Sequence, residues 1–163
     1  MSDNVRILVD TNVWIDFLRA PLPELRLLVK RQRVVTHSCV VGEVMVGAVC
    51  DRAMVRDFFR SLPLAKEADL TSVLGMVESR QLYGRGLQWN DMQLLAAAKI
   101  SKTPLWTRDK RLAAAAEELG ILWRERVRGS NASFHDDLVR TARESLRDQS
   151  GVAFAPRGTF RQS

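Results

Sequence analysis

A short apolar run near the N-terminus constrains this fold more than any other stretch. Ile7, Leu8 and Val9 are consecutive apolar residues, as expected for a strand buried on both faces of a parallel sheet. Asp10 follows where that strand should end. Because ligands of open α/β sheets bind at the carboxyl ends of the strands, Asp10 is well placed for chemistry. The alternative is that Asp10 only caps the following helix.

Strand and helix patterns alternate along the first 123 residues. Apolar runs predict strands at 7–9, 33–36, 104–107 and 121–123. Helical periodicity and Pro or Gly breaks predict helices at 13–19, 23–29, 40–49, 53–61, 67–82, 91–100 and 110–119. Ser38 and Asn90 are the predicted N-caps of the third and sixth helices. This alternation predicts an α/β fold, a three-layer α/β/α sandwich with a central parallel sheet.

The bulk properties narrow the class of protein. A chain of 163 residues fits one domain with an appendage. Its net charge of +6 is compatible with a polyanionic partner such as nucleic acid. There is no signal-peptide core, and no apolar run approaches the ~20 residues that span a bilayer. We therefore expect a cytoplasmic protein without membrane association, in which Cys39 and Cys50 are free thiols.

Acidic residues stand at four places where predicted strands end or helices begin. Each of them alone could cap a helix or be solvated. Carboxylates gathered at one sheet edge repel one another, and a divalent cation removes that repulsion. Oxygen ligands favour Mg²⁺ or Mn²⁺ over zinc, and His37 and His135 are isolated in the sequence. The four acids are Asp10, Glu43, Asp91 and Asp109.

These acids lie in short motifs that together resemble a known family. The motifs are Asp10-Thr11-Asn12, Glu43 with Gly47 four residues later, Asp91 within residues 90–97, and Thr107-Arg108-Asp109. In order and spacing they resemble the acidic signature of PIN-domain ribonucleases, above all the VapC-type toxins of bacterial toxin–antitoxin pairs. The resemblance covers about residues 5–124. Where many members continue with another acid and a Phe, Lys110 and Arg111 follow here.

The resemblance implies a function and a set of partners. Asp10, Glu43, Asp91 and Asp109 would hold one or two Mg²⁺ or Mn²⁺ ions, with Thr11, Asn12 and Thr107 in or beside the acidic shell. The family cleaves RNA endonucleolytically, is silenced by a cognate antitoxin and commonly forms homodimers. In this hypothesis the metal generates hydroxide from bound water.

Basic and aromatic residues near the acidic motifs are candidates for RNA contacts. Trp14 and Trp89 could stack on bases or belong to the core. Cations could guide the RNA backbone or form an ordinary solvated surface. The candidate cations are Arg85, Arg108, Lys110 and Arg111.

The predicted nuclease domain spans residues 1–128 and leaves a C-terminal segment. Residues 129–133 read as a linker, and Ser130-Asn131-Ala132 within them resembles a cloning remnant. Residues 134–163 predict a helix followed by an extended arm, which resembles the way antitoxins of this class dock onto their toxins. In that hypothesis Arg157 or Arg161 reaches the acidic pocket. A natural C-terminal extension or a disordered tail is the alternative.

Two other classes of protein stay open from the sequence alone. One is a non-catalytic α/β binding module whose acids only cap helices. The other is an acidic-pocket phosphoryl-transfer enzyme, such as a phosphatase or a phospho-accepting receiver. Against a D-x-D phosphatase, position 12 is Asn rather than Asp.

Overall fold

The computed structural model describes residues 5–125 of the 163-residue chain. The predicted linker at 129–133, and the predicted helix and extended arm at 134–163, lie outside the described residues.

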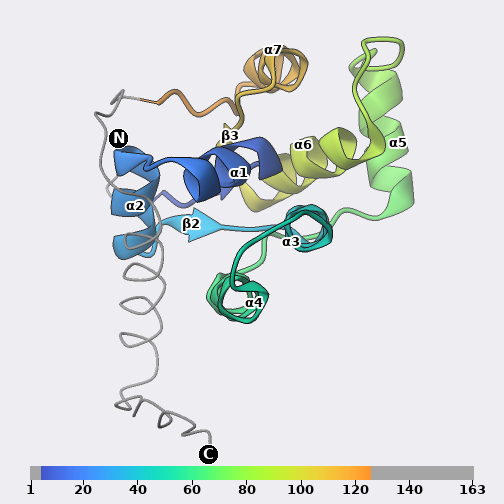
Figure 1. The fold of residues 1–163 in the computed structure, drawn as a ribbon. Coiled ribbons are helices and arrows are strands. Elements are labelled where there is room, and N and C mark those ends of the chain that lie inside the picture. The colour runs from blue at the N-terminus through green and yellow to red at the C-terminus, as the bar shows by residue number, and fades with distance from the viewer. Residues whose placement is uncertain (1–4, 126–163) are drawn as a thin grey trace, which may run out of the picture.

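A three-stranded parallel sheet forms the centre of the fold (Figure 1). Its strands are β1 (Ile7–Val9), β2 (Val34–Val35) and β3 (Leu105–Trp106), arranged in the order β2-β1-β3. Leu8 pairs with Val35 on one side and with Leu105 on the other. All three residues of β1 are fully buried, which is what their uninterrupted apolar run predicts for a central strand.

Seven helices surround this sheet within the described residues. They cover both of its faces, with α1 in front of the strands and α6 behind them in Figure 1. The predicted three-layer α/β/α sandwich is therefore confirmed. The helices are α1 (Thr11–Arg19), α2 (Pro23–Lys30), α3 (Ser38–Val46), α4 (Arg52–Ser61), α5 (Leu70–Ser79), α6 (Trp89–Ser101) and α7 (Lys110–Glu118).

Several predicted boundaries differ from the structure. The N-cap of α3 is His37 rather than Ser38, and its Nδ1 accepts a hydrogen bond from the Cys39 N–H. The N-cap of α6 is Gln88, so Asn90 lies inside the helix. The predicted strand at 121–123 is reduced to a single bridge between Leu105 and Leu122. The starts of α3 and α6 are set by local hydrogen bonds at the helix ends, where boundaries commonly differ by one or two residues.

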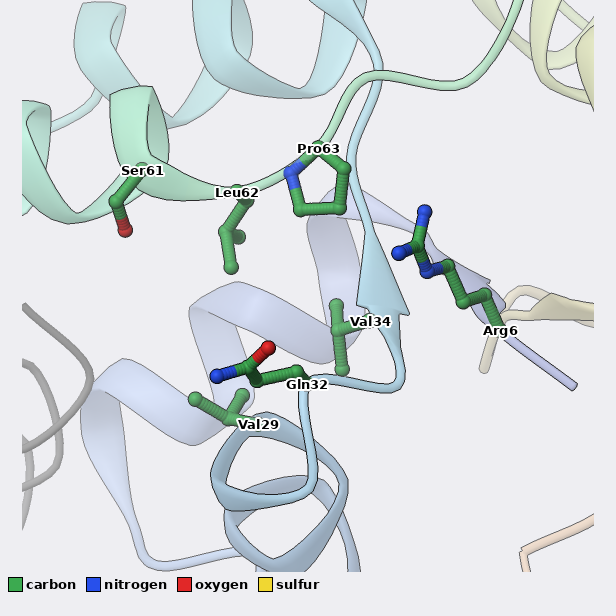
Figure 2. A pocket seen from close by; sticks show the side chains of 7 residues that line it. All are labelled: Arg6, Val29, Gln32, Val34, Ser61, Leu62 and Pro63. Carbon is green, nitrogen blue, oxygen red and sulfur yellow. The ribbon is translucent and has the colours of Figure 1, made fainter. Parts of the chain in front are cut away.

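A cavity of about 280 Å³ opens beside the start of β2 (Figure 2). The cavity lies at the amino ends of β1 and β2, away from the carboxyl ends where the acids stand, so none of the four predicted acids lines it. Its lining combines apolar side chains from the core with polar side chains at the rim: Arg6, Val29, Gln32, Val34, Ser61, Leu62 and Pro63. Among residues 5–125 no helix is long and apolar enough to cross a membrane.

Candidate active site

Asp10 lies at the carboxyl end of the central strand, where it caps α1. Its backbone N–H donates to the Trp106 carbonyl at 2.9 Å, which ties this position to β3. The Oδ1 atom accepts the Thr11 N–H at 2.6 Å, and Oδ2 accepts the Thr107 hydroxyl at 2.7 Å. The residue is only 6% exposed. The side chain is therefore held in one orientation between two strands.

Thr107 connects the ends of β1 and β3 through its hydroxyl. Besides donating to Asp10, the Oγ1 atom accepts hydrogen bonds from Asn12 Nδ2 at 3.2 Å and from the Asp109 N–H at 3.1 Å. The Asn12 side chain also accepts the Arg108 N–H at 3.1 Å. The Asp-Thr-Asn and Thr-Arg-Asp motifs, which are 95 residues apart in sequence, are thus joined in one hydrogen-bond network.

Glu43, on α3, joins the beginning of α6 to this network. Its Oε2 accepts the Thr11 hydroxyl at 2.5 Å, and its Oε1 accepts Asn90 Nδ2 at 2.5 Å. Glu43 itself lies on α3 and is exposed to solvent. The sequence analysis assigned Asn90 only a capping role and missed this contact. Its position directly before Asp91 was the one available signal.

Asp91 and Asp109 occupy the first turns of their helices. Asp91 is the third residue of α6, and its Oδ2 accepts the Gln88 N–H at 2.7 Å. Asp109 caps α7, where its Oδ1 accepts the backbone N–H groups of Arg111 and Leu112 at 2.8 and 2.9 Å. Each carboxylate has one further oxygen for which the described residues supply no hydrogen bond.

At this edge of the sheet, the pKa values of Asp10 and Asp91 are both raised. The pKa of Asp10 is raised to about 6, mainly by burial and also by the charges of Asp91 and Glu43, against the hydrogen bonds from Thr107 and Thr11 that lower it. Burial also raises the pKa of Asp91, as do the charges of Asp109 and Glu43. These interactions show that the four acids share one neighbourhood. Among the described residues, no cationic side chain lowers the pKa of Asp10.

The donor set fits a divalent metal ion, although the side chains are not drawn together around one point. Within residues 5–125, no three His, Cys, Asp or Glu side chains are gathered tightly enough to form a complete metal site. Each acid is instead turned toward a hydroxyl, an amide or a backbone N–H. Asp10 is nevertheless a buried carboxylate with other carboxylates as its charged neighbours, and an oxygen-binding cation would relieve that repulsion.

Three of the four cations that were predicted to guide RNA have hydrogen-bond or ion-pair partners in the structure. Arg85 donates to Glu118 at 2.7 Å and to the Gln81 carbonyl. Arg108 pairs with Asp16 at 3.0 Å and with Glu125 at 2.9 Å. Arg111 donates to the Gly86 carbonyl at 3.3 Å. Lys110 is exposed and has no partner among the described residues.

The two tryptophans predicted as stacking candidates differ in exposure. Trp14 is 1% exposed and packs edge-on against Phe17, Phe58 and Phe59, so it belongs to the core. Trp89 is 47% exposed at the first position of α6. The core alternative is thus correct for Trp14, and a surface contact stays open for Trp89.

Comparisons with known proteins agree with this fold. The sequence profile of the PIN domain matches residues 7–118. Ribonuclease VapC32 from two strains of Mycobacterium tuberculosis is 39% identical over 122 residues, which are 74% of this chain and 98% of the relative. The crystal structure of PAE2754 from Pyrobaculum aerophilum has a similar fold. It has a TM-score of 0.50 at 19% identity and covers 86% of this chain and 91% of that one.

The profile match spans most of the described residues, including every element from β1 to α7. The similarity to VapC32 extends over nearly the whole length of that ribonuclease. The chain therefore belongs to the PIN-domain family and, within it, to the VapC-type ribonucleases of toxin–antitoxin pairs.

Proposed function

We propose that this protein is a metal-dependent endoribonuclease toxin whose centre is the acidic edge of the sheet. The observation that supports this most is Asp10: a buried carboxylate, oriented by Thr107 and Thr11, with the charges of Asp91 and Glu43 beside it. The name of the related VapC32 gives the substrate class, which is RNA. Neither a simple helix cap nor a binding module requires uncompensated charge at a buried position.

Asp10, Asp91, Asp109 and Glu43 are the residues proposed to hold Mg²⁺ or Mn²⁺. When bound, such an ion supplies a water of lowered pKa and neutralises charge on the scissile phosphate. Thr107 and Thr11 fix the Asp10 carboxylate, and Asn90 and Thr11 fix Glu43. These second contacts set the orientation of the oxygen atoms before any ligand arrives. Lys110, exposed beside Asp109, is placed to attract the RNA backbone.

RNA cleavage by Asp10→Asn and Asp69→Asn variants tests this proposal. Both aspartates cap a helix, and Asn is an equally good N-cap, so each substitution removes charge and preserves the cap. With Mg²⁺ or Mn²⁺ present, we expect Asp10→Asn to lose at least a hundredfold of the cleavage rate. Asp69→Asn should cleave like the wild type. Equal rates for wild type and Asp10→Asn would contradict the proposal.

Two partners belong to the same proposal. The first is a cognate antitoxin, which we infer from membership of a toxin–antitoxin family. The second is another copy of this chain. Apolar side chains on α3 and α5 face solvent, with Val46 89%, Leu70 60% and Leu74 48% exposed, and exposed apolar residues of this kind mark protein interfaces.

The oligomeric proposal is tested by light scattering on charged variants. Leu74→Asp should shift a dimer toward the monomer because the new carboxylate would be buried at the interface. Leu64→Asp is a matched control, since Leu64 is 64% exposed but lies outside both helices. A wild-type chain with the mass of a monomer would contradict the proposal.

Both cysteines are free, and we propose the reducing cytoplasm as the location.

A further inference from the structure

Trp89 is an exposed indole at the border of the acidic edge. It is 47% exposed, whereas Trp14 and Trp106 are each 1% exposed. A half-exposed tryptophan is unusual, because burying its large apolar surface is normally favourable. No ring contact of Trp89 with another aromatic residue is found among the described residues. Its surface is therefore available to a ligand.

The position of Trp89 along α6 connects it to the site. It is the first residue of the helix, and the next residue, Asn90, donates its side-chain amide to Glu43 at 2.5 Å. Asp91 follows directly and shares its electrostatic neighbourhood with Glu43 and Asp109. A ligand held at these acids therefore lies near the start of α6, where Trp89 is exposed.

The backbone that carries Trp89 is fixed from two sides. Arg85 pairs with Glu118 on α7, and Arg111 donates to the Gly86 carbonyl. On the C-terminal side of Trp89, the Asn90 side chain donates a hydrogen bond to Glu43. A backbone that is fixed by its neighbours loses little conformational freedom when a ligand binds. The backbone at Trp89 is thus preorganised, and its exposed indole offers a flat apolar surface.

We propose that Trp89 stacks on an unpaired base of the RNA substrate next to the cleavage site. This inference rests on the proposed ribonuclease function and assigns Trp89 a role in positioning the substrate. A base in a duplex is already stacked on both faces, whereas an unpaired base gains a partner in the indole. The net charge of +6 is compatible with the polyanionic ligand that this contact needs.

The test measures RNA binding to chains in which all four acids are intact, and the wild-type chain is the parent. Ca²⁺, an oxygen-binding ion, takes the place of Mg²⁺ so that turnover is slowed. The probe is a single-stranded 12-nucleotide RNA of mixed sequence with one 2-aminopurine, compared with the same RNA annealed to its complement. We expect Trp89→Leu to weaken single-strand binding at least tenfold and to abolish the 2-aminopurine fluorescence change. Trp89→Phe should keep most of both signals, because it retains an aromatic face.

Ile100→Ala is the matched control for loss of an exposed apolar side chain. Ile100 is 43% exposed and lies near the other end of the same helix, about 16 Å along its axis. It should bind the probe like the parent, and circular dichroism should show that all variants are folded. Equal binding by the parent and Trp89→Leu, or a preference for the duplex, would overturn the stacking inference alone. Binding by none of the variants, the parent included, would overturn the proposed function as well.

Discussion

At the scale of single residues, three of the four acids take part in helix capping, which was the simpler explanation for them. Asp10 and Asp109 are N-caps, and Asp91 accepts a backbone N–H within its own first turn. Capping does not exclude metal binding, because a carboxylate oxygen that accepts a hydrogen bond retains a second lone pair. A role in capping alone, however, leaves the burial of Asp10 unexplained.

The raised pKa of Asp10 predicts an unusual dependence of stability on pH in the metal-free protein. The folded-state pKa of about 6 exceeds the ordinary value of 3.8, so the stabilising protonated form is fully present below pH 3.8 and is lost as the pH rises through 6. At pH 7.5 this costs on the order of 2–3 kcal/mol. In EDTA, urea denaturation should therefore show Asp10→Asn more stable than wild type at pH 7.5.

The advantage of Asp10→Asn should shrink toward pH 4, where the wild-type carboxyl is protonated. Added Mg²⁺ or Mn²⁺ should also reduce the advantage, because the ion stabilises the ionised form of Asp10 in the wild type only. An advantage of the variant that is the same at pH 4 and pH 7.5 would contradict the assignment of the shifted pKa to Asp10.

At the scale of secondary-structure elements, the connection between α5 and α6 controls where Asp91 lies. Gly86 has φ +72° in this connection, and a Cβ atom at this position would stand 2.6 Å from the Arg111 guanidinium. Gly84 has φ +71° and no atom near its missing Cβ. The two glycines therefore share the backbone requirement but differ in their surroundings.

These glycines make a matched pair of substitutions. Gly84→Ala should destabilise the protein by about 1 kcal/mol, because an L-residue is strained in the left-handed region. Gly86→Ala should cost roughly 0.5–1 kcal/mol more, since it also displaces Arg111 from the Gly86 carbonyl. Chemical denaturation measures both. Equal losses of stability would show that the Arg111 contact contributes nothing.

Sequence patterns predicted the presence of each helix and strand more accurately than the residues at which it begins and ends. The apolar run at residues 7–9 predicts β1, Pro23 predicts the start of α2, and Asp109 predicts the start of α7. Residues 67–69 were predicted to be helical, but Asp69 caps α5 and accepts the Ser72 N–H. A two-residue strand such as β2 leaves little periodicity to recognise, and its length depends on which neighbours pair with it.

At the scale of the whole molecule, parallel strand pairing brings the acids to one edge. Because β1 and β3 run in the same direction, the residues after Val9 and after Trp106 meet, and Thr107 reaches Asp10. For this reason the sequence predicts that Asp10 and Asp109 lie at the same edge of the sheet. It could not predict that Arg85, Arg108 and Arg111 are engaged by Glu118, Asp16, Glu125 and Gly86, since those contacts depend on side-chain packing between distant elements.

The described residues contain all four acids and the whole sheet, which predicts the behaviour of a shortened chain. Ribonuclease VapC32 is matched over 98% of its length by 122 residues of this one. A chain that ends at Glu125 should therefore fold, with an unchanged thermal midpoint in the presence of metal. If the C-terminal residues inhibit in the manner of an antitoxin, the shortened chain should cleave RNA faster than the full chain. Equal rates would contradict that inhibitory role.

The most direct test of the account is a calorimetric titration of Mn²⁺ and of Mg²⁺ into the full chain at pH 7.5. A metal site at the acidic edge predicts saturable binding to the wild type and to Asp69→Asn, and its loss in Asp10→Asn with the fold intact by circular dichroism. Equal heats for wild type and Asp10→Asn, or no heat from any folded variant, would contradict the claim that the acidic edge is a metal site. The acids would then be helix caps alone.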